Sequence, residues 1–109
     1  MIERMVWPPH DVMVARNDEL IAERFNWPDG VLEEVRALRK AHPGWGITWA
    51  QGAIGAWRED GYYAWVVNGW PRRRFVYRAT AVELGAVLEL APYPSRDWTP
   101  PGGWLPLTA

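Results

Sequence analysis

The chain of 109 residues contains no cysteine, a single lysine (Lys40) and a single serine (Ser95). The absence of cysteine excludes disulfide bonds, thiol nucleophiles and thiolate metal ligands. Its apolar runs are shorter than the roughly 18 residues that span a membrane. Residues 1–9 carry an acidic residue and a Pro-Pro pair where a secretory signal has a basic region and a long apolar run. We therefore expect a cytoplasmic protein with no membrane partner.

Sequence motifs for catalysis and for metal or nucleotide binding are also missing. The only histidines are His10 and His42, and His42 occupies a position where a cation is expected at the end of a helix. Ser95 lies in Pro94-Ser95-Arg96, which lacks the strand–turn–helix setting of a nucleophile elbow. The glycines form turn signals and no phosphate-binding loop. We expect a protein that is not an enzyme, with no catalytic residue, metal or cofactor.

Tryptophan is the most unusual component of the composition, with nine residues. The core of a domain of this length has room for only some of them, so others are expected at the surface or in an interface. The formal net charge is −1, which gives no overall attraction to nucleic acid.

Three segments have helical signals. A first helix is expected over 19–25, capped by Asn17-Asp18 and preceded by a short strand over 12–15. The residues between Asp29 and Pro43 have acidic side chains early, basic side chains late and one apolar stripe, which predicts a second helix. That stripe consists of Leu32, Val35, Leu38 and Ala41.

A third helix is predicted after Thr80. The sequence Thr80-Ala81-Val82-Glu83 is a capping box, in which the threonine and glutamate side chains satisfy free amide groups at the start of a helix. Ala91-Pro92 ends this helix.

Between the second and third helices the pattern changes to a period of two, which indicates β-strands. Gln51-Gly52, Asp60-Gly61 and Asn68-Gly69 divide this stretch at intervals that suit two-residue hairpin turns. We predict four antiparallel strands, over 45–50, 53–59, 62–67 and 70–78. The turns would pair Trp57 with Ala64 and Val67 with Trp70.

Counting residues from these turns gives two apolar sheet faces. One face is bulky and aromatic, and it collects Trp45, Ile47, Trp49, Ile54, Ala56, Arg58, Tyr63, Trp65, Val67, Trp70, Arg72 and Arg74. The opposite face is lined with smaller residues. A bulge at Pro71 would exchange Phe75 and Tyr77 with the arginines. Two helices can cover one face only, so the other needs the N-terminal segment, the C-terminal segment or a partner.

The expected fold is therefore α+β, a four-stranded antiparallel meander flanked by helices, with an N-terminal helical segment. The domain would span 1–92, and residues 93–109 would form an extended arm rich in tryptophan and proline. We expect Trp98 and Trp104 to dock this arm on the aromatic sheet face, either of the same chain or of a second copy.

Two stretches carry a resemblance to known proteins. Leu38-Arg39-Lys40-Ala41-His42-Pro43-Gly44-Trp45, then aromatic strands and Ala79-Thr80-Ala81-Val82-Glu83-Leu84, resemble small uncharacterised actinobacterial proteins with a Leu-Arg-x-x-x-Pro-Gly-Trp helix end. The resemblance implies no activity.

These patterns favour a non-catalytic module that binds a protein, or a second copy as a homodimer, through a surface rich in tryptophan and arginine, the residue types that dominate binding hot spots. The expected contact residues are Trp49, Trp65, Trp70, Arg72, Arg74, Trp98 and Trp104. The alternative is a regulator that binds nucleic acid through the sheet edge at Arg72-Arg73-Arg74. A small enzyme without a recognisable motif is the third hypothesis.

Overall fold

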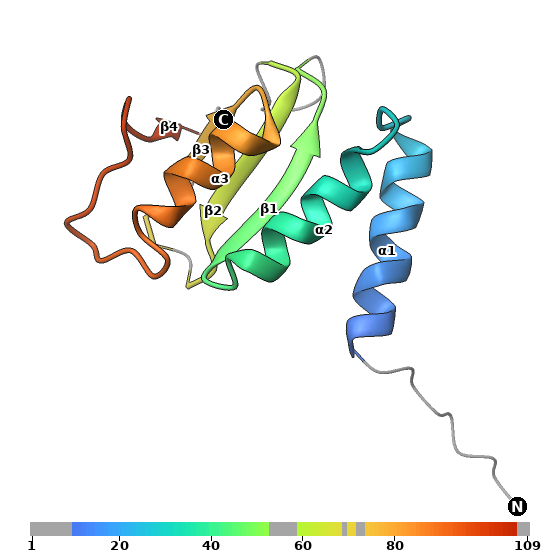
Figure 1. Ribbon diagram of the computed structural model, residues 1–109, viewed down its shortest axis with the longest axis horizontal. Helices are drawn as coiled ribbons and strands as arrows, with labels where there is room; N and C mark the ends of the chain where they lie inside the picture. The colour runs from blue at the N-terminus through green and yellow to red at the C-terminus, as the bar shows by residue number, and fades with distance from the viewer. Residues whose placement is uncertain (1–9, 53–58, 69, 72–73, 107–109) are drawn as a thin grey trace, which may run out of the picture. The chain divides into compact units, whose positions relative to one another are not determined.

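A computed structural model describes residues 10–52, 59–68, 70–71 and 74–106 of the chain. Its elements follow the order α1, α2, β1, β2, β3, α3 and β4 (Figure 1). The backbone groups into two compact units, Met1–Leu32 and Glu33–Ala109. Over the described residues the fold is α+β, with three helices and three antiparallel strands in one sheet, joined at one edge by a two-residue fourth strand.

The first helix, α1 (His10–Arg24), is longer than the sequence predicts. Residues 12–15 are helical, so the short strand expected there is wrong, and Asn17 and Asp18 lie inside the helix. A strand needs a neighbour for its backbone, whereas a helix satisfies its own hydrogen bonds. The helix ends where predicted: Asn26 has a φ of 50°, and Trp27 N–H donates to the Ala22 carbonyl at 2.9 Å.

The second helix, α2 (Val31–Ala41), lies where its charge order and apolar spacing predict. Its buried residues are Val31, Val35 and Leu38, while Ala41 is exposed. The buried side of the helix therefore includes Val35 and Leu38 as predicted, but Val31 in place of Leu32 and Ala41. His42 follows the helix and is buried, at 7 % exposure.

Three strands form the sheet: β1 (Trp45–Ala50), β2 (Gly61–Val66) and β3 (Arg74–Arg78). Both pairs are antiparallel, with Ile47 opposite Ala64 and Ala64 opposite Val76. Strand β2 is thus the central strand. One face, which we call the helix face, carries Trp45, Ile47, Trp49, Tyr62, Ala64, Val66 and Val76.

The direct pairing of β1 with β2 corrects the predicted meander. Ala64 has neighbours in β1 and β3, so the expected pairing of Trp57 with Ala64 is wrong. Gly61 pairs with Ala50 as part of β2 and is not the second residue of a hairpin turn. The Asp60 carboxylate instead accepts a hydrogen bond from Gly52 N–H at 2.7 Å, at the base of a longer connection. The predicted strand over 53–59 falls almost wholly outside the described residues, and a four-stranded meander is not confirmed.

The connection between β2 and β3 is also longer than the predicted two-residue turn, since β2 ends at Val66 and β3 begins at Arg74. Val67 N–H donates to the Gly44 carbonyl, and Trp70 N–H donates to the Asn68 side chain at 2.9 Å, so the predicted pairing of Val67 with Trp70 is wrong. The described part of β3 begins at Arg74, with Tyr77 opposite Tyr63. Phe75 and Tyr77 therefore share a sheet face with Tyr63. This is the placement that we expected only if a bulge at Pro71 exchanged these two residues with the arginines.

The third helix, α3 (Ala81–Glu89), begins where predicted, with Thr80 as its N-cap. Thr80 Oγ1 accepts from Glu83 N–H at 3.2 Å and donates to the Glu83 carboxylate at 3.0 Å. Helices α2 and α3 lie side by side over the helix face (Figure 1). The largest fully buried side chains are Tyr63, Phe75, Ile47, Leu84, Leu88, Val35 and Val76.

The C-terminal segment folds back and contacts strand β3 of the same chain. Strand β4 (Leu105–Pro106) pairs with the edge of β3, placing Leu105 opposite Phe75. Arg78 donates from its guanidinium to the Pro101 carbonyl at 2.7 Å. The arm therefore contacts the sheet at its β3 edge, and Trp98 and Trp104 contact Trp45, one residue of the predicted aromatic face.

Candidate functional site

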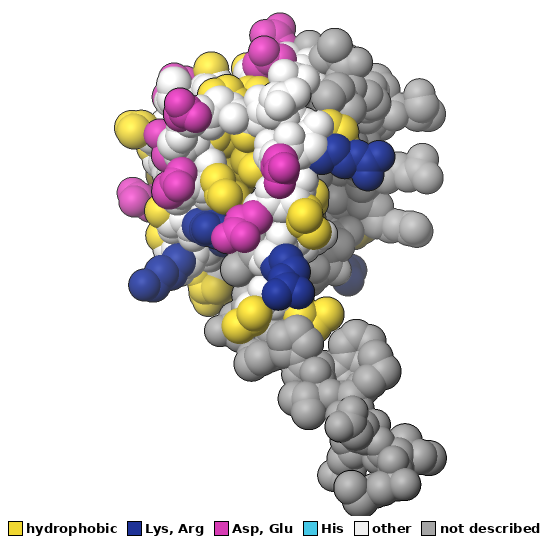
Figure 2. Space-filling model, turned by 90° about the vertical axis from the view of Figure 1, so that its right-hand side faces the viewer, with side chains coloured by type: hydrophobic (Ala, Val, Ile, Leu, Met, Phe, Trp, Pro, Cys, Tyr) yellow, Lys and Arg dark blue, Asp and Glu magenta, His cyan; other side chains and the backbone are white. Residues whose placement is uncertain are grey.

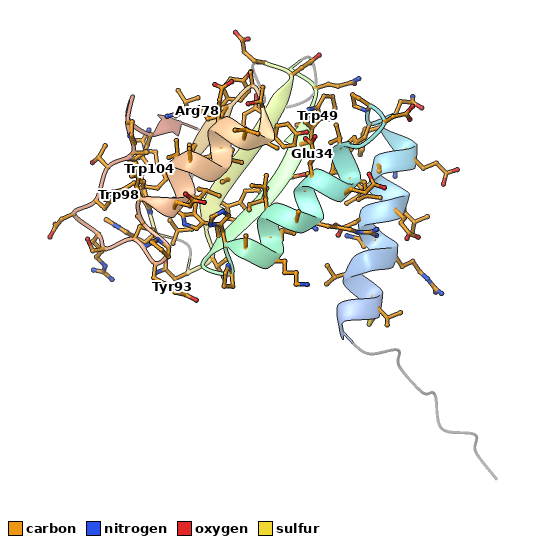
Figure 3. The ribbon with its side chains drawn as sticks, in the orientation of Figure 1. Glu34, Trp49, Arg78, Tyr93, Trp98 and Trp104 are labelled. Carbon is orange, nitrogen blue, oxygen red and sulfur yellow. The ribbon has the colours of Figure 1, made fainter. Side chains whose placement is uncertain are left out.

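The tryptophans of the arm contact the start of β1. Trp45, Trp98 and Trp104 form a cluster with ring centroids 5.9–6.0 Å apart. Trp45 is buried and donates from Nε1 to the Ala91 carbonyl at 2.9 Å, while Trp98 and Trp104 are half-buried. Figure 3 shows Trp98 and Trp104 on the arm beside α3. This cluster attaches the arm to its own chain, because aromatic rings at such distances attract one another.

The other predicted contact residues are divided between different surfaces. Trp49 is buried on the helix face. Trp65 lies on the opposite face, where its ring covers Gly46 and 39 % of the residue is exposed. Arg74 is exposed at the β3 edge, and Arg72 lies outside the described residues. The predicted set is therefore not brought together into one surface.

A cation–π contact joins the arm to the connection between β2 and β3. The Arg96 guanidinium lies 5.1 Å from the centre of the Trp70 ring. Trp70 remains 42 % exposed, and Arg96 is exposed. Stacking on the ring restricts the arginine while leaving polar edges of both groups accessible to a partner.

Residues that precede Trp70 and Arg96 in the sequence line a small pocket of about 280 Å³. Tyr93 and Val67 contribute to its lining and are strongly exposed, at 75 % and 61 %. The remaining lining residues are Pro43, Gly44, Val66, Asn68 and Pro94. Gly44 is needed here, because a side chain at this position would overlap the Pro92 carbonyl. We call the exposed residues Val67, Trp70, Tyr93 and Arg96, with this pocket, the Trp70 surface.

A second hollow is the groove between α2 and α3, of about 520 Å³. Its lining residues are Glu34, Ala37, Leu38, Ala41, His42, Ala81, Val82, Gly85, Ala86 and Glu89. At one end, near the start of α3, Tyr62 donates a hydrogen bond to the Glu34 carboxylate. Burial and this carboxylate raise the pKa of Tyr62 above its ordinary value of 10.0. This hydrogen bond links α2 to β2.

The residues weighed for catalysis are dispersed. His42 is buried after α2, whereas Ser95 is exposed on the arm, where its carbonyl accepts from Trp98 N–H at 3.1 Å. Among the residues that the structure describes, no three histidine or carboxylate side chains gather as metal ligands. Within the same residues, no helix combines the length and apolar character needed to cross a membrane.

One face of the molecule carries both acidic and basic side chains. Figure 2 shows acidic and basic side chains interspersed with hydrophobic ones on the face that it draws. At the β3 edge, Arg78 uses one nitrogen for the Tyr77 carbonyl and another for the Pro101 carbonyl. Part of the basic character near Arg74 is thus used to hold the arm.

The contact residues predicted from the sequence include Trp70. They do not include the other three members of the Trp70 surface, Val67, Tyr93 and Arg96. Their signal in the sequence is weak, because Tyr93-Pro94-Ser95-Arg96 reads only as part of an extended arm. Figure 3 shows Tyr93 near the end of the sheet at which the arm begins. Only the folding of the arm back on the chain brings Arg96 to Trp70.

Comparisons of this chain with protein-family models, with curated proteins and with solved structures gave no match.

Proposed function

We propose that this chain is a non-catalytic protein-binding module and that its contact site is the Trp70 surface. The observation that carries the proposal is the Arg96–Trp70 contact beside the strongly exposed Tyr93 and Val67. Trp, Tyr and Arg are the residue types most enriched in binding hot spots. Here Trp70 and Arg96 are exposed and in contact, and the exposed Tyr93, three residues before Arg96, lines a pocket.

The energetics of association favour such a surface. An arginine that is already stacked on a ring loses little further side-chain entropy when a partner binds. The exposed apolar area of Tyr93 and Val67 is available for burial, and the pocket can receive an apolar side chain. The Arg96 guanidinium can donate to a carboxylate or carbonyl of the partner.

The partner can be another protein or a second copy of the chain, and one experiment separates these cases. A photo-crosslinking amino acid is placed at Tyr93 in the full-length protein and irradiated in cells of the source organism. The matched control carries the same amino acid at Leu20 of α1, which is 58 % exposed. We expect a defined adduct from position 93 only, whose mass distinguishes a homodimer from a different partner.

Two further variants connect that adduct to the site. Trp70→Ala and Arg96→Ala should each reduce its yield at least about tenfold, as expected for hot-spot residues. Circular dichroism of the variants checks that the fold is retained. Equal adducts from positions 20 and 93, or full yield in Arg96→Ala, would contradict the proposal.

A further inference from the structure

The groove between α2 and α3 has walls with the periodicity of helix packing. On α2 it is lined by Glu34, Ala37, Leu38 and Ala41, and on α3 by Val82, Gly85, Ala86 and Glu89. Both sets follow the spacing i, i+3, i+4 and i+7, which aligns side chains along one side of a helix. The groove thus extends along two turns of each helix, about 10 Å.

The groove can accept a helix because its lining is small and apolar. Ala37, Ala41 and Ala86 are exposed along its walls. Gly85 lacks a side chain directly above Leu38, where a Cβ would lie 3.4 Å from Leu38 Cδ2. Small residues at such positions let a third helix approach closely and pack into the space between two others. Val82, at 84 % exposure, adds an apolar side chain that an occupant would cover.

The charges around the groove are acidic. Glu34 lines one end and Glu89 the other, and both are exposed. Helix α3 contains no basic residue. On α2, the spacing of 100° per residue places Arg36, Arg39 and Lys40 on the side away from the groove, and Arg39 donates from Nε to the Ile47 carbonyl at 2.9 Å. His42 lines the groove and is buried.

We propose that this groove binds an amphipathic helix of a partner protein whose apolar stripe is flanked by lysine or arginine. The stripe would lie on the alanines and Val82, and its flanking cations would face Glu34 and Glu89. This mode is helix-in-groove recognition, with anchors at i, i+3, i+4 and i+7. The site is separate from the Trp70 surface, so the two proposals stand or fall independently.

The probe for the test is a synthetic helix of about 14 residues, long enough to be partly helical in water. It carries leucines at i, i+3, i+4 and i+7 with flanking lysines, and its twin has glutamate at each lysine. Isotope-labelled full-length protein is titrated with each peptide and followed by NMR. We expect the lysine peptide to perturb the amides of α2 and α3, and to bind at least about tenfold more tightly than the glutamate peptide.

Variants then test the groove itself. Ala37→Gln, which places a longer side chain on the α2 wall of the groove, should weaken binding about tenfold or more. Glu89→Gln should weaken it about two- to fivefold, the effect of one exposed ion pair. Glu33→Gln is the matched control for both, because Glu33 is exposed on α2 but does not line the groove.

Four outcomes would overturn the groove proposal: no binding of the lysine peptide, equal affinity for both peptides, perturbations centred elsewhere, or an equal effect of Glu33→Gln and Glu89→Gln. Trp70→Ala should leave peptide affinity unchanged. If it alone abolishes binding, the peptide occupies the Trp70 surface and the groove proposal fails while the proposed function stands.

Discussion

At the scale of the residue, Gly46 and Trp65 illustrate how one missing side chain determines the position of another. The two residues are opposite each other in β1 and β2, and the Trp65 ring lies where a Cβ of Gly46 would be. A glycine inside a strand usually weakens it, and an aromatic ring from the neighbouring strand covers the exposed backbone. The glycine thus creates the space that leaves Trp65 flat on the sheet.

This contact leads to a prediction for Gly46→Ala. The added methyl group must displace the Trp65 ring, so we expect the free energy of unfolding to fall by about 1–3 kcal/mol, measured by chemical denaturation. Gly85→Ala is the matched control, because a Cβ there meets only Leu38 at 3.4 Å. That variant should be neutral or more stable by up to about 1 kcal/mol, since alanine favours helix. Equal stability of Gly46→Ala and the wild type would contradict the packing described.

Tyr62 predicts the alkaline pH dependence of stability. Its pKa is raised above 10.0 in the folded chain by burial and by Glu34, and burial also raises the pKa of Tyr77. The unfolded chain loses its phenolic protons from about pH 10, while the folded chain keeps them. The contribution of these two protonated phenols to the free energy of unfolding is therefore fully present below pH 10. It is lost as the pH rises further, by at most about 1.4 kcal/mol per pH unit for each tyrosine.

The measurement is urea unfolding at a series of pH values from neutral to above 10. Tyr62→Phe should make the alkaline loss of stability shallower, and Tyr62→Phe/Tyr77→Phe shallower still. An unchanged slope in both variants would show that neither phenol is responsible.

At the scale of the element, local signals predicted the helices better than the strands. The capping box at Thr80 and the charge order of α2 lie within one turn of the residues they affect, and both helices were predicted correctly. Strand register depends on pairing between distant residues. Asp60-Gly61 is favourable in a hairpin turn, but the same pair also suits the base of a longer loop, which is its place here. Sequence alone did not separate these two settings.

The capping box supplies a prediction for α3. Thr80→Ala removes the oxygen that accepts from Glu83 N–H, so the free energy of unfolding should fall by about 1 kcal/mol. Thr80→Ser keeps that oxygen and should retain most of the stability. Thermal unfolding of the three proteins tests this order, and a Thr80→Ala protein as stable as the wild type would refute it.

The arm is a second element whose contribution can be measured. Trp98 and Trp104 are half-buried against Trp45, so each change to alanine should cost about 1–2.5 kcal/mol, roughly half the cost for a fully buried tryptophan. Deletion of 93–109 also removes the Arg78–Pro101 hydrogen bond and β4. This deletion should lower the Tm strongly. It should also expose the apolar Trp45 ring to solvent and so promote aggregation of the protein. A truncated protein with unchanged Tm and solubility would mean that the arm is a free tail.

At the scale of the whole molecule, the sequence indicated the residue types of the Trp70 surface better than its location. The excess of tryptophan correctly implied that some would be exposed, as Trp65 and Trp70 are. Assigning them to one sheet face failed because Trp49 and Trp65 lie on opposite faces. Arg96 reaches Trp70 only through the path of the arm, and no local pattern encodes a contact between residues so distant in the sequence.

The charge of the whole molecule gives an experiment that separates the protein-binding proposal from the nucleic-acid alternative. The formal net charge is −1, and the Arg78 guanidinium is bonded to backbone carbonyls beside Arg74. Of the basic residues that the structure describes in β3, Arg78 is thus engaged by the arm and Arg74 is exposed, so we expect only weak binding to duplex DNA, without sequence preference. Each phosphate contact releases counterions, so the slope of log affinity against log salt is about −0.9 per contact.

Fluorescence anisotropy with labelled duplexes between about 50 and 200 mM salt measures that slope. We expect a slope no steeper than that of one or two contacts, and Arg74→Ala should reduce it by about one contact. The exposed Arg16 on α1 is the matched control, because Arg16→Ala removes the same charge from another element. A sequence-specific complex that persists at about 150 mM salt and is lost in Arg74→Ala but not in Arg16→Ala would favour the nucleic-acid function. Equal, small effects of the two variants instead indicate a surface that attracts phosphate only through scattered cations, as expected when binding depends on Trp70, Tyr93 and Arg96.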